Sequence, residues 1–270
     1  MAEANAQFVG SIPEHYDRSL GPMFFEPYAA DLVGRLRVPP GGRVLEVACG
    51  TGIVTARLRK ALPPDATLVA TDLNEPMIAF AKTARSLGGT VEWQTADAQS
   101  LPFPDASFDA VVCQFGLMFV PDKALALREA HRVLKPGGVL AFSVWQDLDA
   151  NPVGRIAHTV ISGFFPTDPP TFYLVPFGMD DEPLLRRLVT EAGFQVTTLD
   201  RVKLEARSPS ATEAARGLVL GNPVYGAIEA RGTAKPDVIM AAVAAALAEA
   251  GGSAPLRLPM GAIVVVARTA

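Results

Sequence analysis

Short apolar runs alternate with amphipathic stretches between residues 43 and 145, and this alternation predicts a parallel β-sheet. Five runs have the length and composition of strands, at 43–48, 67–72, 90–96, 109–115 and 139–145. The first, RVLEVA, is apolar on both faces, as expected for a strand that helices cover on both sides. Residues 51–62, 75–84 and 122–135 show helical spacing, and Asn74 is placed to cap the second of these helices. Strand–helix–strand repeats of this kind join parallel strands by right-handed crossovers.

The pattern changes after residue 146. Residues 147–180 are rich in Pro, Gly and Phe, 181–194 fit a helix and 195–206 a long alternating strand. Helical patterns follow at about 210–220 and 237–249, and an apolar run at 261–267 fits a last strand. We therefore predict an α/β fold with an N-terminal helical lid segment (1–40), a core (41–146, 181–207 and 259–270) and helical lid insertions (147–180 and 208–258).

Composition narrows the class of protein. Of the 270 residues, 49% are hydrophobic, enough to bury a sizeable core, and the net charge of −4 disfavours a nucleic-acid partner. Two cysteines, Cys49 and Cys113, and three scattered histidines provide no disulfide framework and no metal-ligand spacing. We expect both thiols to be reduced and buried. Neither a signal peptide nor a membrane span is predicted, so we expect a cytoplasmic protein; a homodimer is compatible with this composition.

Candidate chemistry gathers where the first four predicted strands end. In an open parallel sheet, ligands bind beyond the carboxyl ends of the strands. Asp72 follows Gly52 by about 20 residues, the offset at which an acid accepts hydrogen bonds from ribose hydroxyls. Asp97 stands after the third strand, where a carboxylate can accept from an adenine amine. These positions predict an adenosine-binding cleft.

The group attached to the adenosine is constrained by the glycine series. A dinucleotide fingerprint needs a third glycine where this chain has Thr55, and a phosphate loop needs a lysine that is absent. Pyrophosphate is therefore disfavoured, and a cationic sulfonium with an amino-acid tail fits better.

Ordered motifs spanning about 43–145 carry a resemblance to a known family. They are Glu46-x-x-x-Gly50-x-Gly52, Asp72, Ala96-Asp97-Ala98 with Leu101-Pro102-Phe103, Phe108-Asp109-Ala110-Val111-Val112, and Leu134-Lys135-Pro136-Gly137-Gly138. As a set they resemble the class I S-adenosylmethionine-dependent methyltransferases, most of all the branch typified by ubiquinone and menaquinone biosynthesis methyltransferases. One departure is Ala48, where many members have glycine.

The resemblance implies a Rossmann-like seven-stranded sheet, mostly parallel with the last strand antiparallel, whose final two strands match about 195–205 and 261–268. It implies S-adenosyl-L-methionine as cofactor and S-adenosyl-L-homocysteine as product. The cofactor contacts that it implies are Gly50 and Gly52 at the methionine part beside Ala48, Glu46 through water at the amino group, Asp72 at the ribose, Leu73 and Met77 near the adenine, Asp97 and Ala98 at the adenine edge, and Gln114 and Phe115 at the methionine end.

An aromatic residue of the N-terminal segment often closes the site in such relatives, and Tyr16 is the candidate here. A helix cap at the neighbouring Asp17 is an equally weighted interpretation of this segment. Methyl transfer from a sulfonium is an in-line displacement, which needs a base only for a phenol, an enol or a protonated amine. His15 and His158 are the candidate catalytic bases.

Aromatic residues are concentrated in the insertions and indicate the acceptor. They are Phe164, Phe165, Phe172, Tyr173, Phe177 and Tyr225. We predict a methyltransferase that acts on a small apolar or aromatic molecule by O-, N- or C-methylation. The alternatives are an NAD(P)-dependent oxidoreductase and a catalytically silent methyltransferase-like module that only binds the cofactor.

Overall fold

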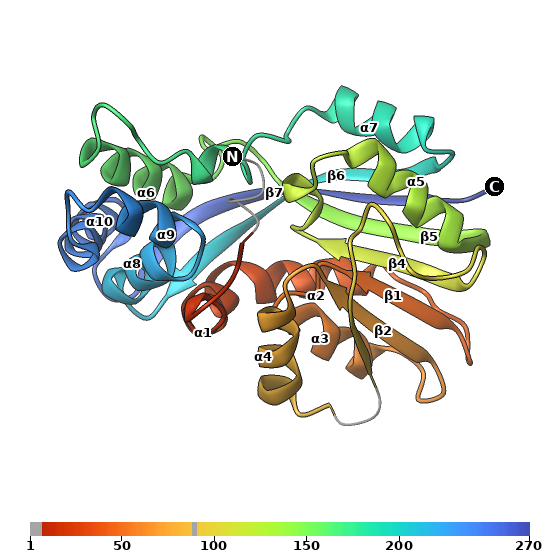
Figure 1. Cartoon of the computed structure of the whole chain (residues 1–270). Coiled ribbons are helices and arrows are strands. Elements are labelled where there is room, and N and C mark those ends of the chain that lie inside the picture. The colour runs from red at the N-terminus through yellow and green to blue at the C-terminus, as the bar shows by residue number, and fades with distance from the viewer. Residues whose placement is uncertain (1–6, 88–90) are drawn as a thin grey trace.

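The computed structural model describes residues 7–87 and 91–270, and a seven-stranded β-sheet forms its centre (Figure 1). The strands are β1 (Arg43–Val47), β2 (Thr67–Asp72), β3 (Glu92–Thr95), β4 (Phe108–Gln114), β5 (Leu134–Trp145), β6 (Gln195–Ser208) and β7 (Leu256–Arg268). Their order is β3-β2-β1-β4-β5-β7-β6. β1 to β5 are parallel, and β7 is antiparallel to both of its neighbours. The predicted fold class is confirmed.

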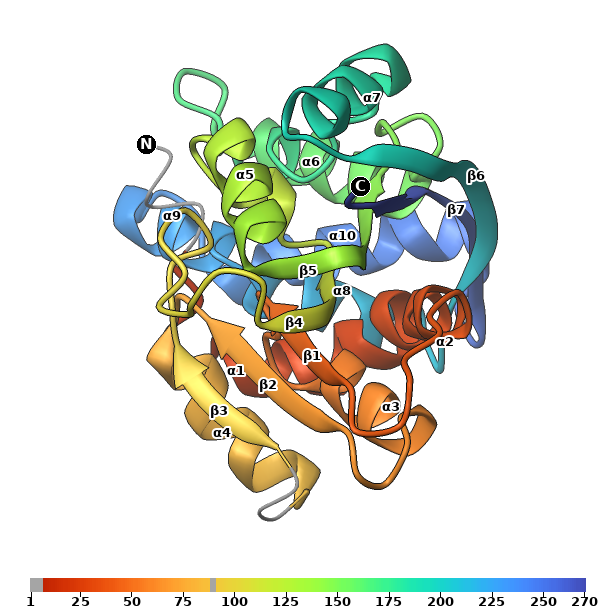
Figure 2. The same ribbon diagram turned by 90° about the vertical axis from the view of Figure 1, so that its right-hand side faces the viewer.

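Helices cover both faces of this sheet because its strands are apolar on both sides. Val44 belongs to the core that packs under α2 (Glu26–Gly34), α3 (Ile53–Ala61) and α4 (Glu75–Arg85). The next residue, Leu45, points to the other face, where α5 (Lys123–Val133) and α7 (Glu182–Glu191) pack. Figure 2 shows the twist of the sheet between these two helical layers. The order of strands reverses between β1 and β4, which creates the switch point at which ligands bind.

β6 and β7 extend beyond the rest of the sheet as a two-stranded ribbon. β5 stops pairing with β7 at Trp145, opposite Ala262, whereas β6 and β7 stay paired as far as Ser208 and Leu256. Four helices lie at this end of the molecule (Figure 1): α6 (Pro152–Gly163), α8 (Ala211–Leu220), α9 (Val224–Arg231) and α10 (Pro236–Gly251). α10 packs on α8, α6 and β7. The helical layer therefore lies past the carboxyl ends of the parallel strands.

The N-terminal segment joins this layer to the sheet. α1 (Ile12–His15) continues without a break into the π-helical turns of η2 (Tyr16–Phe25) and then into α2. η2 packs against α8, β6 and α2, and its apolar residues Leu20, Met23 and Phe24 are buried. Asp17 lies inside this continuous helical stretch, so the helix-cap interpretation of Asp17 is wrong.

Several predicted element bounds differ from the structure. The insertion at 147–180 was predicted to be helical without bounds, and it contains α6; β7 begins at Leu256 rather than near residue 261. The third predicted strand, 90–96, shortens to β3, and residue 90 lies outside the described residues. Asn74 precedes α4 but does not cap it with its side chain. Cys49 and Cys113 are free and buried, as expected. No helix within the described ranges is long and apolar enough to cross a membrane.

Candidate functional site

A cleft of about 470 Å³ opens where β1, β2, β3 and β4 end, at the switch point of the sheet. It brings together most of the residues that the sequence nominated, although they come from distant parts of the chain. Those lining it are Tyr16, Ala48, Gly50, Asp72, Leu73, Met77, Asp97, Ala98, Gln114 and Phe115. The structure thus assembles one cleft from the ends of four strands and from the N-terminal segment.

Asp72 organises the floor of the cleft. One carboxylate oxygen accepts a 2.8 Å hydrogen bond from the backbone N–H of Gly50, and the other accepts a 2.8 Å bond from the N–H of Asn74. Burial raises the pKa of Asp72, and these hydrogen bonds oppose the rise because they favour the charged form. Asn74 is occupied here, donating to Asp72 and accepting from the N–H of Phe8, which explains why it does not cap α4.

The chemistry of the cleft fits a cationic ligand with a flat apolar part. Two carboxylates, Asp72 and Asp97, line it, and none of its lining residues in the described part of the chain is Lys or Arg. A pyrophosphate would therefore meet negative charge without a counter-cation. The buried Oε1 of Gln114 has no partner among the described residues and can accept a hydrogen bond. Leu73 is 58% exposed at the cleft, an apolar side chain that a flat ligand would cover.

Glu46 and Gly52 belong to the support of the cleft rather than to its lining. The buried Oε2 atom of Glu46 lacks a hydrogen-bond partner among the described residues, and burial, with the Asp72 carboxylate adding to it, raises the pKa of Glu46 to about 8. Gly52 has a φ of +79°, and a Cβ there would lie 3.0 Å from Arg85 and from Trp93. Its freedom from a side chain serves packing behind the loop. The proposed contact of Gly52 with the cofactor is not supported by its position.

Two non-glycine residues at the cleft have left-handed backbone conformations. Ala48 has a φ of +56° and Phe115 a φ of +54°, which are sterically costly for residues with a Cβ. The loops that carry them are in close contact, since a Cβ on Gly116 would lie 2.4 Å from that of Ala48. Many members of the family have glycine at the position of Ala48, and glycine adopts this left-handed conformation freely. The backbone of this chain is therefore strained at Ala48. The strain directs the ring of Phe115 into the cleft wall.

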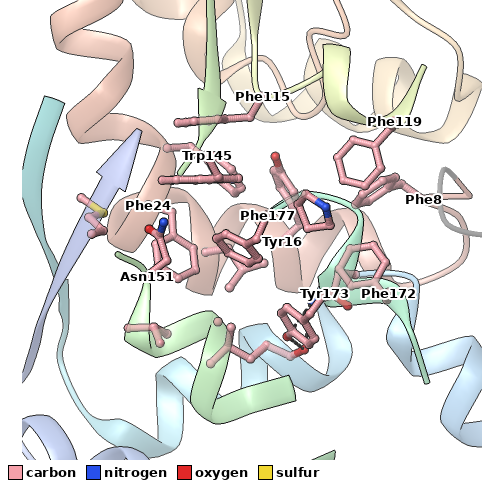
Figure 3. Close-up of a pocket in the computed structure, with 18 of the residues that line it drawn as sticks. Phe8, Tyr16, Phe24, Phe115, Phe119, Trp145, Asn151, Phe172, Tyr173 and Phe177 are labelled. Carbon is pink, nitrogen blue, oxygen red and sulfur yellow. Dashed lines mark hydrogen bonds between the residues drawn. The ribbon is translucent and has the colours of Figure 1, made fainter. Parts of the chain in front are cut away.

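A second cavity, which we call the aromatic cavity, lies on the other side of that wall (Figure 3). Phe8, Tyr16, Phe115 and Phe119 line both cavities. Phe115 stacks on Trp145 with ring centroids 3.7 Å apart, and the pair closes one side of the aromatic cavity. Of the aromatic residues singled out in the insertions, Phe172, Tyr173 and Phe177 line this cavity, whereas Phe164, Phe165 and Tyr225 do not.

Three polar side chains of the aromatic cavity, those of Asn151, Tyr173 and Asn222, form hydrogen bonds within the protein itself. The amide of Asn151 bonds the N–H and the carbonyl of Gly261, each at 3.0 Å. Asn222 donates to the carbonyl of Leu218 and to the hydroxyl of Tyr173, which itself donates to the same carbonyl at 2.6 Å. The cavity therefore offers a ligand mainly the faces and edges of rings.

Neither candidate base lines the aromatic cavity or the cleft. His15 ends α1, and His158 lies on α6 with its Nδ1 3.4 Å from the hydroxyl of Ser162. Partial burial lowers the pKa of His158. The titratable residues lining the aromatic cavity are Tyr16 and Tyr173, and burial raises the pKa of both phenols, so both stay neutral. The structure brings no charged base to this cavity from the described residues.

The sequence missed several residues of the site. Phe8 and Phe119 belong to no recognisable motif, and they enter the shared wall only through the folding of the N-terminal segment and of η4 (Leu117–Phe119). Trp145 was identifiable in principle, because it ends a predicted parallel strand at the edge where ligands bind. Asn74 was also noticed in the sequence, but as a helix cap rather than as a residue of the cleft.

Comparisons with known proteins agree with this geometry. A family model described as "Methyltransferase domain" matches residues 45–142. A ubiquinone/menaquinone biosynthesis C-methyltransferase (UbiE) of Ectopseudomonas mendocina is 34% identical over 178 residues, which are 60% of this chain and 68% of that protein. The UbiE protein of Teredinibacter turnerae is 43% identical over 112 residues, 39% of this chain and 45% of that one. The chain spans about half the length of most of the curated relatives it matches first.

A similar fold also occurs in a protein named for different chemistry. The solved structure of the [4+2]-cyclase SpnF has a TM-score of 0.58 and 24% identity, and the match covers 90% of this chain and 80% of that one. This likeness concerns the fold alone. Function must therefore be argued from the site.

Fold, cleft and matches together define a class I S-adenosylmethionine-dependent methyltransferase, which confirms the resemblance seen in the motifs. Within that class, the chain belongs to the UbiE-type methyltransferase family. The cofactor of the class is S-adenosylmethionine, and the anionic cleft with its exposed Leu73 and unpartnered Gln114 Oε1 suits this cationic adenosyl compound.

Proposed function

We propose that the protein transfers the methyl group of S-adenosylmethionine to a planar aromatic small molecule held in the aromatic cavity. The observation that carries this proposal is the wall of aromatic residues common to the cleft and the aromatic cavity. A methyl group can pass between two ligands only where their sites meet. The lid insertions supply much of the aromatic cavity and lie outside the segment matched by the family model. The chemical class of the acceptor therefore follows from the residues that line the aromatic cavity.

The cofactor roles that we propose follow the lining of the cleft. Asp72 accepts from the ribose hydroxyls, and Asp97 and the backbone of Ala98 read the adenine edge. Leu73 and Met77 pack against the adenine, while Gly50, Ala48, Gln114, Phe115 and Tyr16 surround the methionine end. Glu46 supports the loop from below and reaches the amino group through water.

S-adenosylmethionine supplies an electrophilic methyl group on a sulfonium when it is bound. The chain's own contribution is to hold the acceptor in line with that methyl and to exclude water with rings such as Phe115 and Trp145. Positioning of this kind reaches effective molarities of ~10⁵ M or more in well-oriented systems. Because Tyr16 and Tyr173 stay neutral, the protein provides no strong base at the cavity, which favours an acceptor that is already nucleophilic.

The ring carbon of a quinol that binds as its anion meets this requirement, because its ring is electron-rich before it enters the cavity. A carbon–carbon bond to the methyl group replaces the carbon–sulfur bond, the sulfur leaves as neutral S-adenosylhomocysteine, and the attacked ring carbon then releases its proton to water. The relatives are named as C-methyltransferases of ubiquinone and menaquinone biosynthesis, which agrees with a ring-carbon acceptor. We therefore place quinol-type rings first among acceptors, ahead of amines. We also propose that the protein acts in the cytoplasm and that it can form a homodimer.

The test is a mass-shift screen with methyl-labelled S-adenosylmethionine. Its panel contains phenols and hydroquinones, with and without an apolar chain, and aliphatic amines of similar size. We expect label on aromatic carbon and none on the amines. Transfer to amines alone, or binding of the cofactor without transfer to any ring, would contradict the proposed acceptor class.

A further inference from the structure

At the shared wall, the ring of Phe8 stands at right angles to two other rings. Phe8 makes an edge contact with Tyr16, with centroids 5.8 Å apart and planes at 88°. It makes a second edge contact with Phe119, also at 5.8 Å, with planes at 85°. The three side chains are half-buried and line both the cleft and the aromatic cavity. Figure 3 shows Phe8 and Phe119 side by side at the edge of the aromatic cavity.

Perpendicular aromatic walls are the arrangement that proteins use to bind onium cations, because the face of each ring carries negative charge density. The negative field is reinforced here. The Asp72 carboxylate lines the cleft with these rings and, after burial, is the larger electrostatic cause of the raised pKa of the Tyr16 phenol. No Lys or Arg of the described chain lines the cleft beside the three rings.

Each of the three aromatic residues is also connected by hydrogen bonds or an ion pair to an element of the cofactor cleft. The N–H of Phe8 donates to Asn74 Oδ1, and Asn74 in turn donates to Asp72. Asp17, next to Tyr16, pairs with Arg85, whose Nε donates a 2.8 Å bond to the carbonyl of Thr51 in the glycine loop. The N–H of Phe119 donates to Gly116 at the end of β4.

We propose that Phe8, Tyr16 and Phe119 form an onium cage that holds the sulfonium centre of the cofactor and discriminates by charge between S-adenosylmethionine and its neutral-sulfur product. This inference rests on the proposed function, since it assumes that the cleft holds that cofactor. The cage lies at the junction of the two cavities, where the sulfur atom must be for the methyl to reach an acceptor. Loss of the positive charge on transfer removes the attraction of the rings and favours release of the product.

The test is binding, measured by calorimetry without any acceptor. The ligands are S-adenosylmethionine, S-adenosylhomocysteine, and sinefungin, which carries an ammonium group in place of the methylsulfonium. We expect Phe8→Leu and Phe119→Leu each to weaken the two cationic ligands by about five- to tenfold, the order of a desolvated cation–π contact, and to change S-adenosylhomocysteine by less than about twofold.

Phe177→Leu is the matched control, because Phe177 lines the aromatic cavity and not the cleft. It should leave all three affinities unchanged. A variant with trifluorophenylalanine at position 119 keeps the shape of the ring while weakening its negative face, and it should reproduce the loss for the cationic ligands if the leucine variants fold poorly.

Equal losses for all three ligands would show that the rings only pack, and the cage would be rejected while the proposed function stands. Wild-type protein that binds none of the three would overturn the proposed function and the cage with it.

Discussion

Asp72 shows at the scale of single residues how sequence and structure combine. Its distance from the glycine loop along the chain was sufficient to nominate it. The structure adds that its two oxygens already hold the N–H groups of Gly50 and Asn74, so the same carboxylate shapes the loop and faces the cleft. Glu46 was nominated by the motif of the glycine loop, yet it lies beneath the cleft and is buried.

Asp72→Asn removes the charge and replaces one acceptor oxygen by a donor. We expect the affinity for S-adenosylmethionine to fall tenfold or more, since a hydrogen bond to a charged group contributes ~1.5–3 kcal/mol. Calorimetric titration of the folded variant measures this change. Glu75→Gln is the control, because it removes a nearby exposed carboxylate that does not line the cleft. Unchanged affinity in Asp72→Asn would refute the ribose assignment.

Glu46 makes stability depend on pH in an unusual direction. The folded protein keeps Glu46 protonated up to a pKa of about 8, whereas the unfolded chain releases that proton at about 4.3. Between these values the folded state binds more protons, so stability is lost as the pH rises. We expect the melting temperature of the wild type to fall more between pH 6 and about 8.5 than that of Glu46→Gln. Parallel curves for the two proteins would exclude this role.

At the scale of elements, the periodicity of the sequence predicted the strands and helices whose formation depends on neighbouring residues. The strands β1, β2, β4 and β5 are apolar runs on both faces, and the capping aspartates Asp122 and Asp181 begin α5 and α7 with side-chain bonds to Leu125 and Leu184. The bounds of α6 were not predicted because its start, NPVG, has the composition of a loop. Pro152 is tolerated in its first turn, and packing on Phe177 and β7 compensates for Gly154.

Gly154→Ala tests the packing of α6 on the aromatic cavity. A Cβ at this position would lie 2.6 Å from Cε2 of Phe177, so the ring must move. We expect the free energy of unfolding to fall by about 1–3 kcal/mol, the usual cost of overpacking, and acceptor KM to rise while the cofactor affinity is retained.

Gly163→Ala is the matched control on the same helix, because a Cβ there meets nothing within 4 Å. Chemical denaturation of both variants gives the comparison. If Gly154→Ala had the same free energy of unfolding as Gly163→Ala, the ring of Phe177 could move aside without loss of stability, and the predicted overpacking would be rejected.

At the scale of the whole molecule, one arginine links the N-terminal segment to the cofactor cleft. Arg85, at the end of α4, pairs with Asp17 of η2 and donates to the carbonyl of Thr51. Both partners of the ion pair are largely buried, with 18% and 20% of their side chains exposed. One guanidinium therefore joins the N-terminal segment to the glycine loop.

Arg85→Met keeps the aliphatic stem beside Gly52 and removes the charge and both donors. We expect faster dissociation of S-adenosylmethionine and an affinity weaker by about tenfold, because a largely buried charged hydrogen bond is lost. Stopped-flow displacement measures the dissociation rate. Lys82→Met removes the same charge from an exposed position of α4 and should change neither quantity. Equal dissociation rates in Arg85→Met and Lys82→Met would show that Arg85 does not hold the N-terminal segment over the bound cofactor.

The sequence by itself determined the sheet, its covering helices and the residues at the strand ends, because periodicity and glycine spacing act over a few neighbouring residues. It also placed Asp72, Asp97 and Gln114 at one edge of the sheet, where they line the same cleft, since the ends of parallel strands meet at one edge. Only the tertiary structure placed Phe8 and Phe119 in the wall between the two cavities and moved His15 and His158 away from it. These placements depend on contacts between segments far apart in the chain, and such contacts leave no periodic trace in the sequence.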